Sequence, residues 1–177
     1  IVAYFFIANG TYTILMLMSL GVVWLHNRRL TYQGLDEIRE SAVTPPVTIL
    51  IPAWNEQDVI VDSVRSILQT DYPSLEVVVI DDGSSDGTLQ RLIDAFRLVK
   101  MDLIYRPRLV TKPVRGFYLN PRIPNLLIVT KENGGKPDAL NVGINICRTP
   151  YFCTLDADCI LERDALLRLM RPIIRSP

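Results

Sequence analysis

Histidine is almost absent from this sequence of 177 residues, in which His26 stands alone. A Ser-His catalytic arrangement, or a metal site with several histidine ligands, is therefore excluded within these residues. Cysteine is scarce as well, because Cys147, Cys153 and Cys159 are the only three and lie six residues apart. That spacing fits neither a zinc site nor a CxxC redox pair. An odd number of unpatterned cysteines indicates reduced, buried thiols in the cytosol.

Net charge is also missing, since 19 basic residues balance 19 acidic ones. This balance argues against a protein that binds nucleic acid through bulk positive charge, and we expect no nucleic-acid partner. The distribution is uneven, however: residues 1–25 carry no charge, whereas residues 100–136 have a net charge of +6. We expect this basic, proline-rich segment to form a long connection with a short hairpin. It is either a solvated excursion or a surface for lipid headgroups or an anionic substrate.

The uncharged stretch Ile1–Leu25 is long enough to cross a membrane as a helix, which takes about 20 residues. His26, Arg28 and Arg29 follow it directly, and the positive-inside rule then places the domain after it in the cytoplasm. A buried core helix is the alternative, but uncharged stretches of this length are rare in globular cores.

Beyond Pro45-Pro46, short apolar runs alternate with segments whose apolar residues recur at helical spacing. One predicted helix is capped by Asn55 and ends before Tyr72-Pro73, and a second has its apolar face between Leu89 and Val99. The other predicted elements are strands at 47–51, 75–80, 125–130 and 151–155 and helices at 138–147 and 162–174. This alternation indicates an α/β fold with a mostly parallel sheet that helices flank on both faces.

Polar clusters follow three of these strands, at Asn55-Glu56, Asp81-Asp82 and Asp156-Ala157-Asp158. Ligands of such sheets bind at the carboxyl ends of the strands, so three clusters at one edge indicate a single site. The last cluster is a DxD motif whose two carboxylates can reach one magnesium or manganese ion while substrate phosphates complete its shell. The middle pair can accept hydrogen bonds from a base or a ribose hydroxyl, or can cap the next helix.

Gly134-Gly135-Lys136 precedes a predicted helix and offers close backbone approach and a cation for a phosphate. It is not a P-loop, because the Walker spacing is missing and Pro137 stands where Ser or Thr is required. No GxGxxG follows the first strand, so a dinucleotide-binding fold has no support either.

Four segments in order resemble the family-2 glycosyltransferases, which have the GT-A nucleotide-diphospho-sugar transferase fold: VTILIPAWNE (47–56), VVVIDDGSSDGT (77–88), KENGGKPDALNVGI (131–144) and TLDADCIL (154–161). With its hydrophobic start, the chain most resembles the bacterial synthases of cellulose, chitin, hyaluronan and poly-N-acetylglucosamine. The resemblance implies an inner-membrane protein. Residues 1–27 would form a transmembrane helix, residues 28–45 a juxtamembrane linker, and residues 46–177 the N-terminal, donor-binding part of a cytoplasmic glycosyltransferase domain that is incomplete at its C-terminus.

The resemblance further implies inverting, metal-dependent transfer from a UDP-sugar, with UDP-glucose or UDP-N-acetylglucosamine expected, to a growing polysaccharide. Membrane lipid is the other expected partner. In the family pattern, Pro52, Ala53 and Glu56 line the nucleotide pocket, Asp81 and Asp82 hold uracil and ribose with Asp82 favoured, Lys136 approaches the diphosphate, Asp156 lies against ribose or sugar, and Asp158 together with Asp156 binds the metal.

In the family, the motif that carries the catalytic base and the Gln/Arg/Trp motif for the acceptor come after the metal motif. We therefore expect the base beyond Pro177, and a chain that binds nucleotide without turnover. Glu162 and Asp164 are interpreted as first-turn residues of the last helix. Two other functions are considered: a non-catalytic sugar-nucleotide-binding or scaffold subunit of a membrane complex, and a sugar-1-phosphate nucleotidyltransferase. The latter expects a glycine-rich, arginine-containing loop where this chain has Pro52–Glu56.

Overall fold

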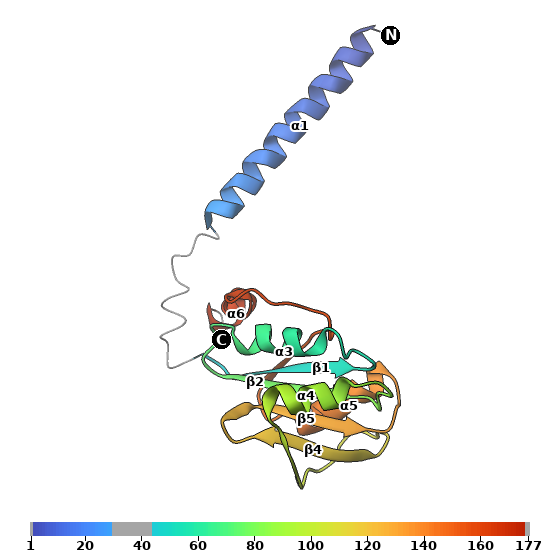
Figure 1. The fold of residues 1–177 in the computed structure, drawn as a ribbon. Coiled ribbons are helices and arrows are strands. Elements are labelled where there is room, and N and C mark those ends of the chain that lie inside the picture. The colour runs from blue at the N-terminus through green and yellow to red at the C-terminus, as the bar shows by residue number, and fades with distance from the viewer. Residues whose placement is uncertain (1, 30–43, 176–177) are drawn as a thin grey trace. The chain divides into compact units, whose positions relative to one another are not determined.

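A computed structural model of the chain describes residues 2–29 and 44–175, and the chain divides into two compact units, Ile1–Glu37 and Ile38–Pro177 (Figure 1). In the first unit, residues 2–29 form helix α1 (Val2–Arg29). Its stretch Phe6–Trp24 is long and apolar enough to cross a membrane, and none of that stretch is buried, whereas a core helix would be mostly buried. The predicted linker 28–45 lies mainly outside the described residues.

Two polar side chains inside this apolar helix have local hydrogen-bond partners. The hydroxyl groups of Thr11 and Thr13 each donate to the backbone carbonyl oxygen four residues earlier, at 2.8 Å. A threonine that bonds in this way exposes no unsatisfied donor, so neither residue prevents the helix from lying in an apolar environment.

The second unit is built on a six-stranded sheet with the order β3-β4-β5-β2-β1-β6. Its strands are β1 (Val47–Ala53), β2 (Leu75–Asp81), β3 (Val99–Met101), β4 (Val114–Asn120), β5 (Ile123–Lys131) and β6 (Tyr151–Thr154). Its described helices are α3 (Ile60–Leu68), α4 (Thr88–Phe96), α5 (Lys136–Ile146) and α6 (Ala165–Arg175).

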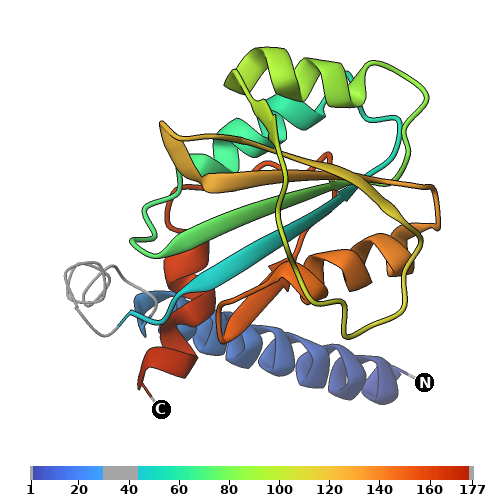
Figure 2. The same ribbon diagram turned by 90° about the horizontal axis from the view of Figure 1, so that it is seen from below.

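The sheet is mostly parallel, as the alternation of strands and helices predicts. Strand β1 pairs in parallel with β2 and β6, and β2 pairs in parallel with β5. Strands β3, β4 and β5 pair antiparallel, so the basic segment does contain a hairpin, formed by β4 and β5. Helices α3 and α4 lie on one face of the sheet and α5 lies on the other (Figure 2). The four parallel strands thus end at one edge, here called the carboxyl edge.

The core forms because successive side chains of the central strands point to opposite faces. Leu50 and Ile80 are fully buried and pack with Ala139 and Val142 of α5. The residues that alternate with them along each strand, such as Ile49 next to Leu50 and Val79 next to Ile80, are equally buried and face the side of α3 and α4. Strands buried on both faces explain why β1 and β2 are almost continuous apolar runs.

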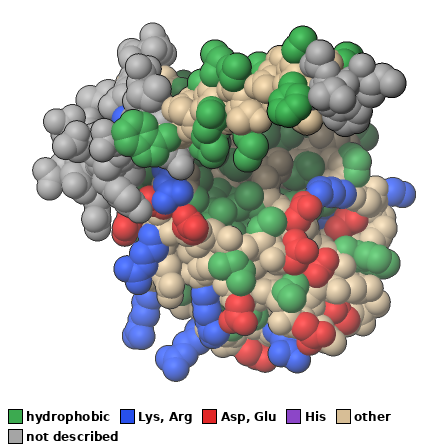
Figure 3. Space-filling view, turned by 90° about the horizontal axis from the view of Figure 1, so that it is seen from above, with side chains coloured by type: hydrophobic (Ala, Val, Ile, Leu, Met, Phe, Trp, Pro, Cys, Tyr) green, Lys and Arg blue, Asp and Glu red, His purple; other side chains and the backbone are tan. Residues whose placement is uncertain are grey.

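On the domain face shown in Figure 3, most basic side chains lie toward the lower left and most acidic ones toward the centre and right, with a few of the opposite sign among each. Two sequence expectations need correction here. Helix α6 begins at Ala165, so Glu162 and Asp164 precede it, and both pair with Arg168, at 3.2 and 2.6 Å. The three cysteines are partly exposed and not buried, because they lie at the ends of α5 and β6 and in the loop after β6.

Gly143 sets how closely α5 approaches the sheet. A Cβ atom there would lie 3.0 Å from Leu50 and 3.2 Å from Ile80, two side chains without exposed surface. We predict that Gly143→Val lowers the free energy of unfolding by about 1–3 kcal/mol through overpacking, as measured by urea denaturation. The neighbouring, exposed Ile144 provides the control: Ile144→Val should change stability by less than about 0.5 kcal/mol. Equal effects of the two variants would contradict this packing.

Candidate functional site

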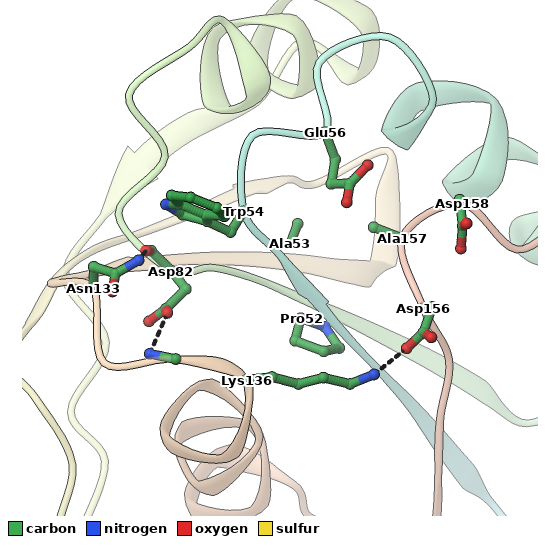
Figure 4. A pocket seen from close by; sticks show the side chains of 11 residues that line it. Pro52, Ala53, Trp54, Glu56, Asp82, Asn133, Lys136, Asp156, Ala157 and Asp158 are labelled. Carbon is green, nitrogen blue, oxygen red and sulfur yellow. Dashed lines mark hydrogen bonds and ion pairs between the residues drawn. The ribbon is translucent and has the colours of Figure 1, made fainter.

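A pocket of about 520 Å³ opens at the carboxyl edge of the sheet (Figure 4). Its walls come from the last residues of β1 and from the segments that follow β1, β2, β5 and β6. The lining residues are Pro52, Ala53, Trp54, Glu56, Asp82, Asn133, Gly135, Lys136, Asp156, Ala157 and Asp158. The structure thus brings together every predicted site residue except Asp81. Their predicted roles toward a ligand stay predictions.

Asn55 does not cap a helix, contrary to the sequence expectation. It adopts a left-handed backbone conformation (φ 58°), and α3 begins only at Ile60 without a side-chain cap. The Asn55 side-chain oxygen instead accepts a hydrogen bond from the Ser85 backbone N–H at 2.8 Å, and the Asn55 backbone N–H donates to Ser84 Oγ at 3.0 Å. Asparagine tolerates this conformation better than most residues. It therefore ties the loop after β1 to the loop after β2 and frees Glu56 to line the pocket.

The two aspartates after β2 have different surroundings. Asp81 is buried outside the pocket lining, where its carboxylate accepts hydrogen bonds from Thr130 Oγ1 (2.9 Å) and the Ser84 N–H (3.2 Å). Asp82 lines the pocket, and its carboxylate accepts from the N–H groups of Gly134 (3.0 Å) and Gly135 (2.7 Å). Neither caps α4, because Asp86 accepts the hydrogen bond from the Thr88 N–H at its start.

Asp82 also belongs to a buried ion cluster that sequence reasoning missed. The Lys131 ammonium, with no exposed surface, lies 2.5 Å from Asp82 Oδ1 and 2.7 Å from Asp138 Oδ2, and it donates to the Glu132 carbonyl oxygen. Burial alone would lower the pKa of Lys131, but hydrogen bonds to Asp138 and Asp82 and their charges outweigh it and raise that pKa. The signal available in the sequence was strand alternation, which places Lys131 on the same buried face as Val129.

Lys136 is the basic residue in the pocket lining, and its side chain is exposed to solvent. It begins α5 directly after Gly135, whose φ of 85° is a conformation that favours glycine. Its ammonium lies 2.5 Å from Asp156 Oδ1, with both side chains more than half exposed. The hydrogen bond and charge of Asp156 raise the pKa of Lys136. A cation and a helix N-terminus at one place form a site suited to phosphate.

Asp156 and Asp158 both project to solvent on either side of the buried Ala157. Within residues 2–29 and 44–175, no group of three His, Cys, Asp or Glu residues is placed to hold a metal ion. Asp156 and Asp158 are a pair of hard oxygen donors in the pocket lining, and such a pair suits magnesium or manganese when ligand oxygens and water complete the shell. Such an ion would share Asp156 with Lys136.

Comparison with known proteins assigns these features to a family. The family model described as glycosyl transferase family 2 matches residues 48–118 and 118–177. The poly-beta-1,6-N-acetyl-D-glucosamine synthase of Staphylococcus aureus (strain MSSA476) is 33% identical over 119 residues, 67% of this chain and 23% of that protein. The synthase of the same name from Staphylococcus epidermidis is 26% identical over 136 residues, 74% and 26% of the two chains. The chain thus spans about a quarter of these relatives.

Solved structures show the same fold. Residues 1–349 of S. aureus TarS in complex with UDP-GlcNAc match with a TM-score of 0.54 and 22% identity, over 73% of this chain and 31% of that chain. The mannosyltransferase PcManGT from Pyrobaculum calidifontis, in complex with GDP-Man and Mn2+, matches with a TM-score of 0.53 and 24% identity, over 85% and 41%. The predicted GT-A fold is confirmed.

The buried ion cluster leads to a stability prediction. Lys131→Met leaves the buried Asp82 carboxylate and the partly exposed Asp138 carboxylate without their shared ammonium, and breaking a buried ion pair from one side costs about 3–5 kcal/mol. We expect a loss of that size in urea denaturation, and a change below about 0.5 kcal/mol for Lys100→Met at an exposed lysine. A Lys131→Met protein within about 1 kcal/mol of the wild type would show that the cluster does not stabilise the domain.

Proposed function

Because the chain belongs to glycosyl transferase family 2, we propose that its carboxyl-edge pocket binds the nucleoside diphosphate of a sugar-nucleotide donor. One observation carries the proposal: Lys136 and the carboxylates Asp156 and Asp158 converge on a single pocket from two different connections, β5 to α5 and β6 to α6. A diphosphate and a divalent metal ion need this combination of a cation and hard oxygen ligands at one place.

The parts of the pocket would contact different parts of the donor. One wall consists of Pro52 and Ala53 at the end of β1 and Glu56 in the loop after it, and this wall would face the nucleoside. Asp82 lies at the adjoining wall. The Asp82 oxygens already accept bonds from Gly134, Gly135 and Lys131, so a ribose or uracil contact would add a further donor to a bound carboxylate. Asp81 lies outside this lining and borders a neighbouring hollow instead, so its predicted contact with uracil or ribose stays a prediction.

Lys136 would act on the diphosphate. Its ammonium neutralises Asp156 while no ligand is bound, and the diphosphate of a donor offers a more highly charged partner. As the bond to the sugar breaks, negative charge grows on the departing diphosphate, and a fixed ammonium stabilises it. A magnesium or manganese ion held by Asp158 and Asp156 would supply further Lewis-acid stabilisation of that charge. The base that activates the acceptor hydroxyl for an inverting attack would lie in another part of the protein.

The substrate class follows from the relatives. A UDP-sugar donor, UDP-N-acetylglucosamine or UDP-glucose, and a growing polysaccharide acceptor are proposed because relatives carry the name poly-beta-1,6-N-acetyl-D-glucosamine synthase and a structural neighbour is in complex with UDP-GlcNAc. We further propose that residues 1–27 anchor the protein in the cell membrane, that residues 28–45 link this span to the domain, and that residues 46–177 are the cytoplasmic donor-binding part. The exposed apolar stretch Phe6–Trp24 supports the anchor.

A non-catalytic sugar-nucleotide-binding subunit is the second candidate. It is favoured by the ion pair between Lys136 and Asp156, which engages one of the two carboxylates that a metal would need. Such a subunit would bind nucleotide equally well with and without metal.

Titration of the full chain with UDP, in the presence and absence of manganese, tests the proposal. We expect manganese to strengthen UDP binding by about tenfold or more, equivalent to about 1.4 kcal/mol, and Asp158→Ala to abolish that gain. Asp62→Ala removes an exposed aspartate on α3, outside the pocket, and should retain the gain. A dissociation constant for UDP that changes neither with manganese nor in Asp158→Ala would favour the non-catalytic subunit. A chain that does not bind UDP at all would refute the proposed function.

A further inference from the structure

The buried ion cluster joins three elements that meet behind the pocket. Lys131 is the last residue of β5, Asp82 follows β2 directly, and Asp138 lies in the first turn of α5. A single ammonium, without exposed surface, holds both carboxylates at 2.5 and 2.7 Å. Asp138 additionally accepts from the Lys112 N–H, at 3.2 Å. Burying the charges of Lys131 and Asp82 beside the partly exposed Asp138 is expensive, which raises the question of whether this arrangement has a function besides stability.

Asp82 also holds the turn Asn133–Gly135, which directly precedes Lys136, through hydrogen bonds. Besides Lys131, its carboxylate binds the N–H groups of Gly134 and Gly135, and its backbone carbonyl oxygen accepts from Asn133 Nδ2 at 2.9 Å. Every residue of this turn is therefore bonded to Asp82, and the next residue in the chain is Lys136 (Figure 4).

The two loops leave little room to move relative to each other. At Gly83, a Cβ atom would lie 2.8 Å from the backbone nitrogen of Asn133. The position of Asp82 and the position of the turn are thus fixed together. The ion cluster, through Asp82, and the close packing at Gly83 both restrict the position of residues 133–135.

We propose that Lys131 is a positioning residue for donor binding. It fixes the Asp82 carboxylate, Asp82 fixes the Gly134–Gly135 turn, and the turn places the Lys136 ammonium where it meets the diphosphate. This inference rests on the proposed function, namely that the pocket binds a nucleoside diphosphate. Lys131 itself does not line the pocket and has no exposed surface.

Loss of Lys131 would act through repulsion. Asp82 and Asp138 are close enough to share one ammonium, and without it the buried Asp82 carboxylate lies near the partly exposed Asp138 carboxylate with no cation between them. Either one takes up a proton or the two move apart. In both cases Asp82 holds the turn less firmly, and Lys136 loses its fixed position while Pro52, Ala53 and Glu56 keep theirs.

This difference can be measured with two ligands, UDP and uridine, on the full chain. Lys136→Ala should weaken UDP binding by about tenfold, the usual effect of one lost charge-assisted contact, and change uridine binding by less than about twofold. Lys131→Met should also weaken UDP binding by about tenfold, and because Asp82 borders the nucleoside wall it should weaken uridine binding too, but clearly less than UDP binding. The double variant should be no weaker than Lys136→Ala, because both changes remove the same contribution.

Controls separate positioning from stability. Lys131→Met/Asp138→Asn removes the repulsion between Asp138 and the buried Asp82 and should fold more stably than Lys131→Met, yet still weaken UDP binding more than uridine binding. Lys100→Met should bind both ligands as the wild type does. Equal weakening of UDP and uridine, or a double variant weaker than Lys136→Ala by the full effect of Lys131→Met, would overturn the inference. A wild-type chain that does not bind UDP would refute the proposed function itself.

Discussion

Lys131 places a positive charge in the interior of the domain, between Asp82 and Asp138, and the carboxyl edge of the sheet is organised around it. An ammonium without exposed surface must keep its partners, because an unpaired buried charge is among the most costly defects a fold can contain. The end of β5, the segment after β2 and the first turn of α5 are therefore held at one point. The Gly134–Gly135 turn is bonded to that point through Asp82.

Parallel strand pairing gives this cluster its place. Because β1, β2, β5 and β6 run in the same direction, the segments that follow them all emerge at the carboxyl edge. Apolar strands buried on both faces carry no side chains for chemistry, so polar groups concentrate in these segments. The pocket thus combines a wall from the end of β1 and the loop after it, a cation at the start of α5 and two carboxylates after β6. Asn55 joins the loop after β1 to the loop after β2 through its hydrogen bonds with Ser84 and Ser85.

The sequence was sufficient to predict features that depend on local pattern. Apolar runs located the parallel strands, and the position of Asp156 and Asp158 directly after a strand placed them at the pocket. Asn55 was misjudged because a residue before a helix can either cap it or turn the chain, and only the contact with Ser85 decides between them. Lys131 was missed because it was counted with the solvent-facing basic residues of its segment. Asp138 was predicted only as the first residue of a helix, and nothing in the local sequence shows that Lys131 and Asp138 meet.

The central claim is that the carboxyl-edge pocket receives the diphosphate of a sugar nucleotide at Lys136 and Asp158. A crystal structure of the chain with UDP and manganese tests this most directly. We expect the diphosphate within hydrogen-bond distance of the Lys136 ammonium, and the anomalous signal of manganese at Asp158. UDP bound instead in the hollow lined by Lys100 and Arg115, or bound in the pocket with Lys136 still paired only to Asp156, would contradict the account.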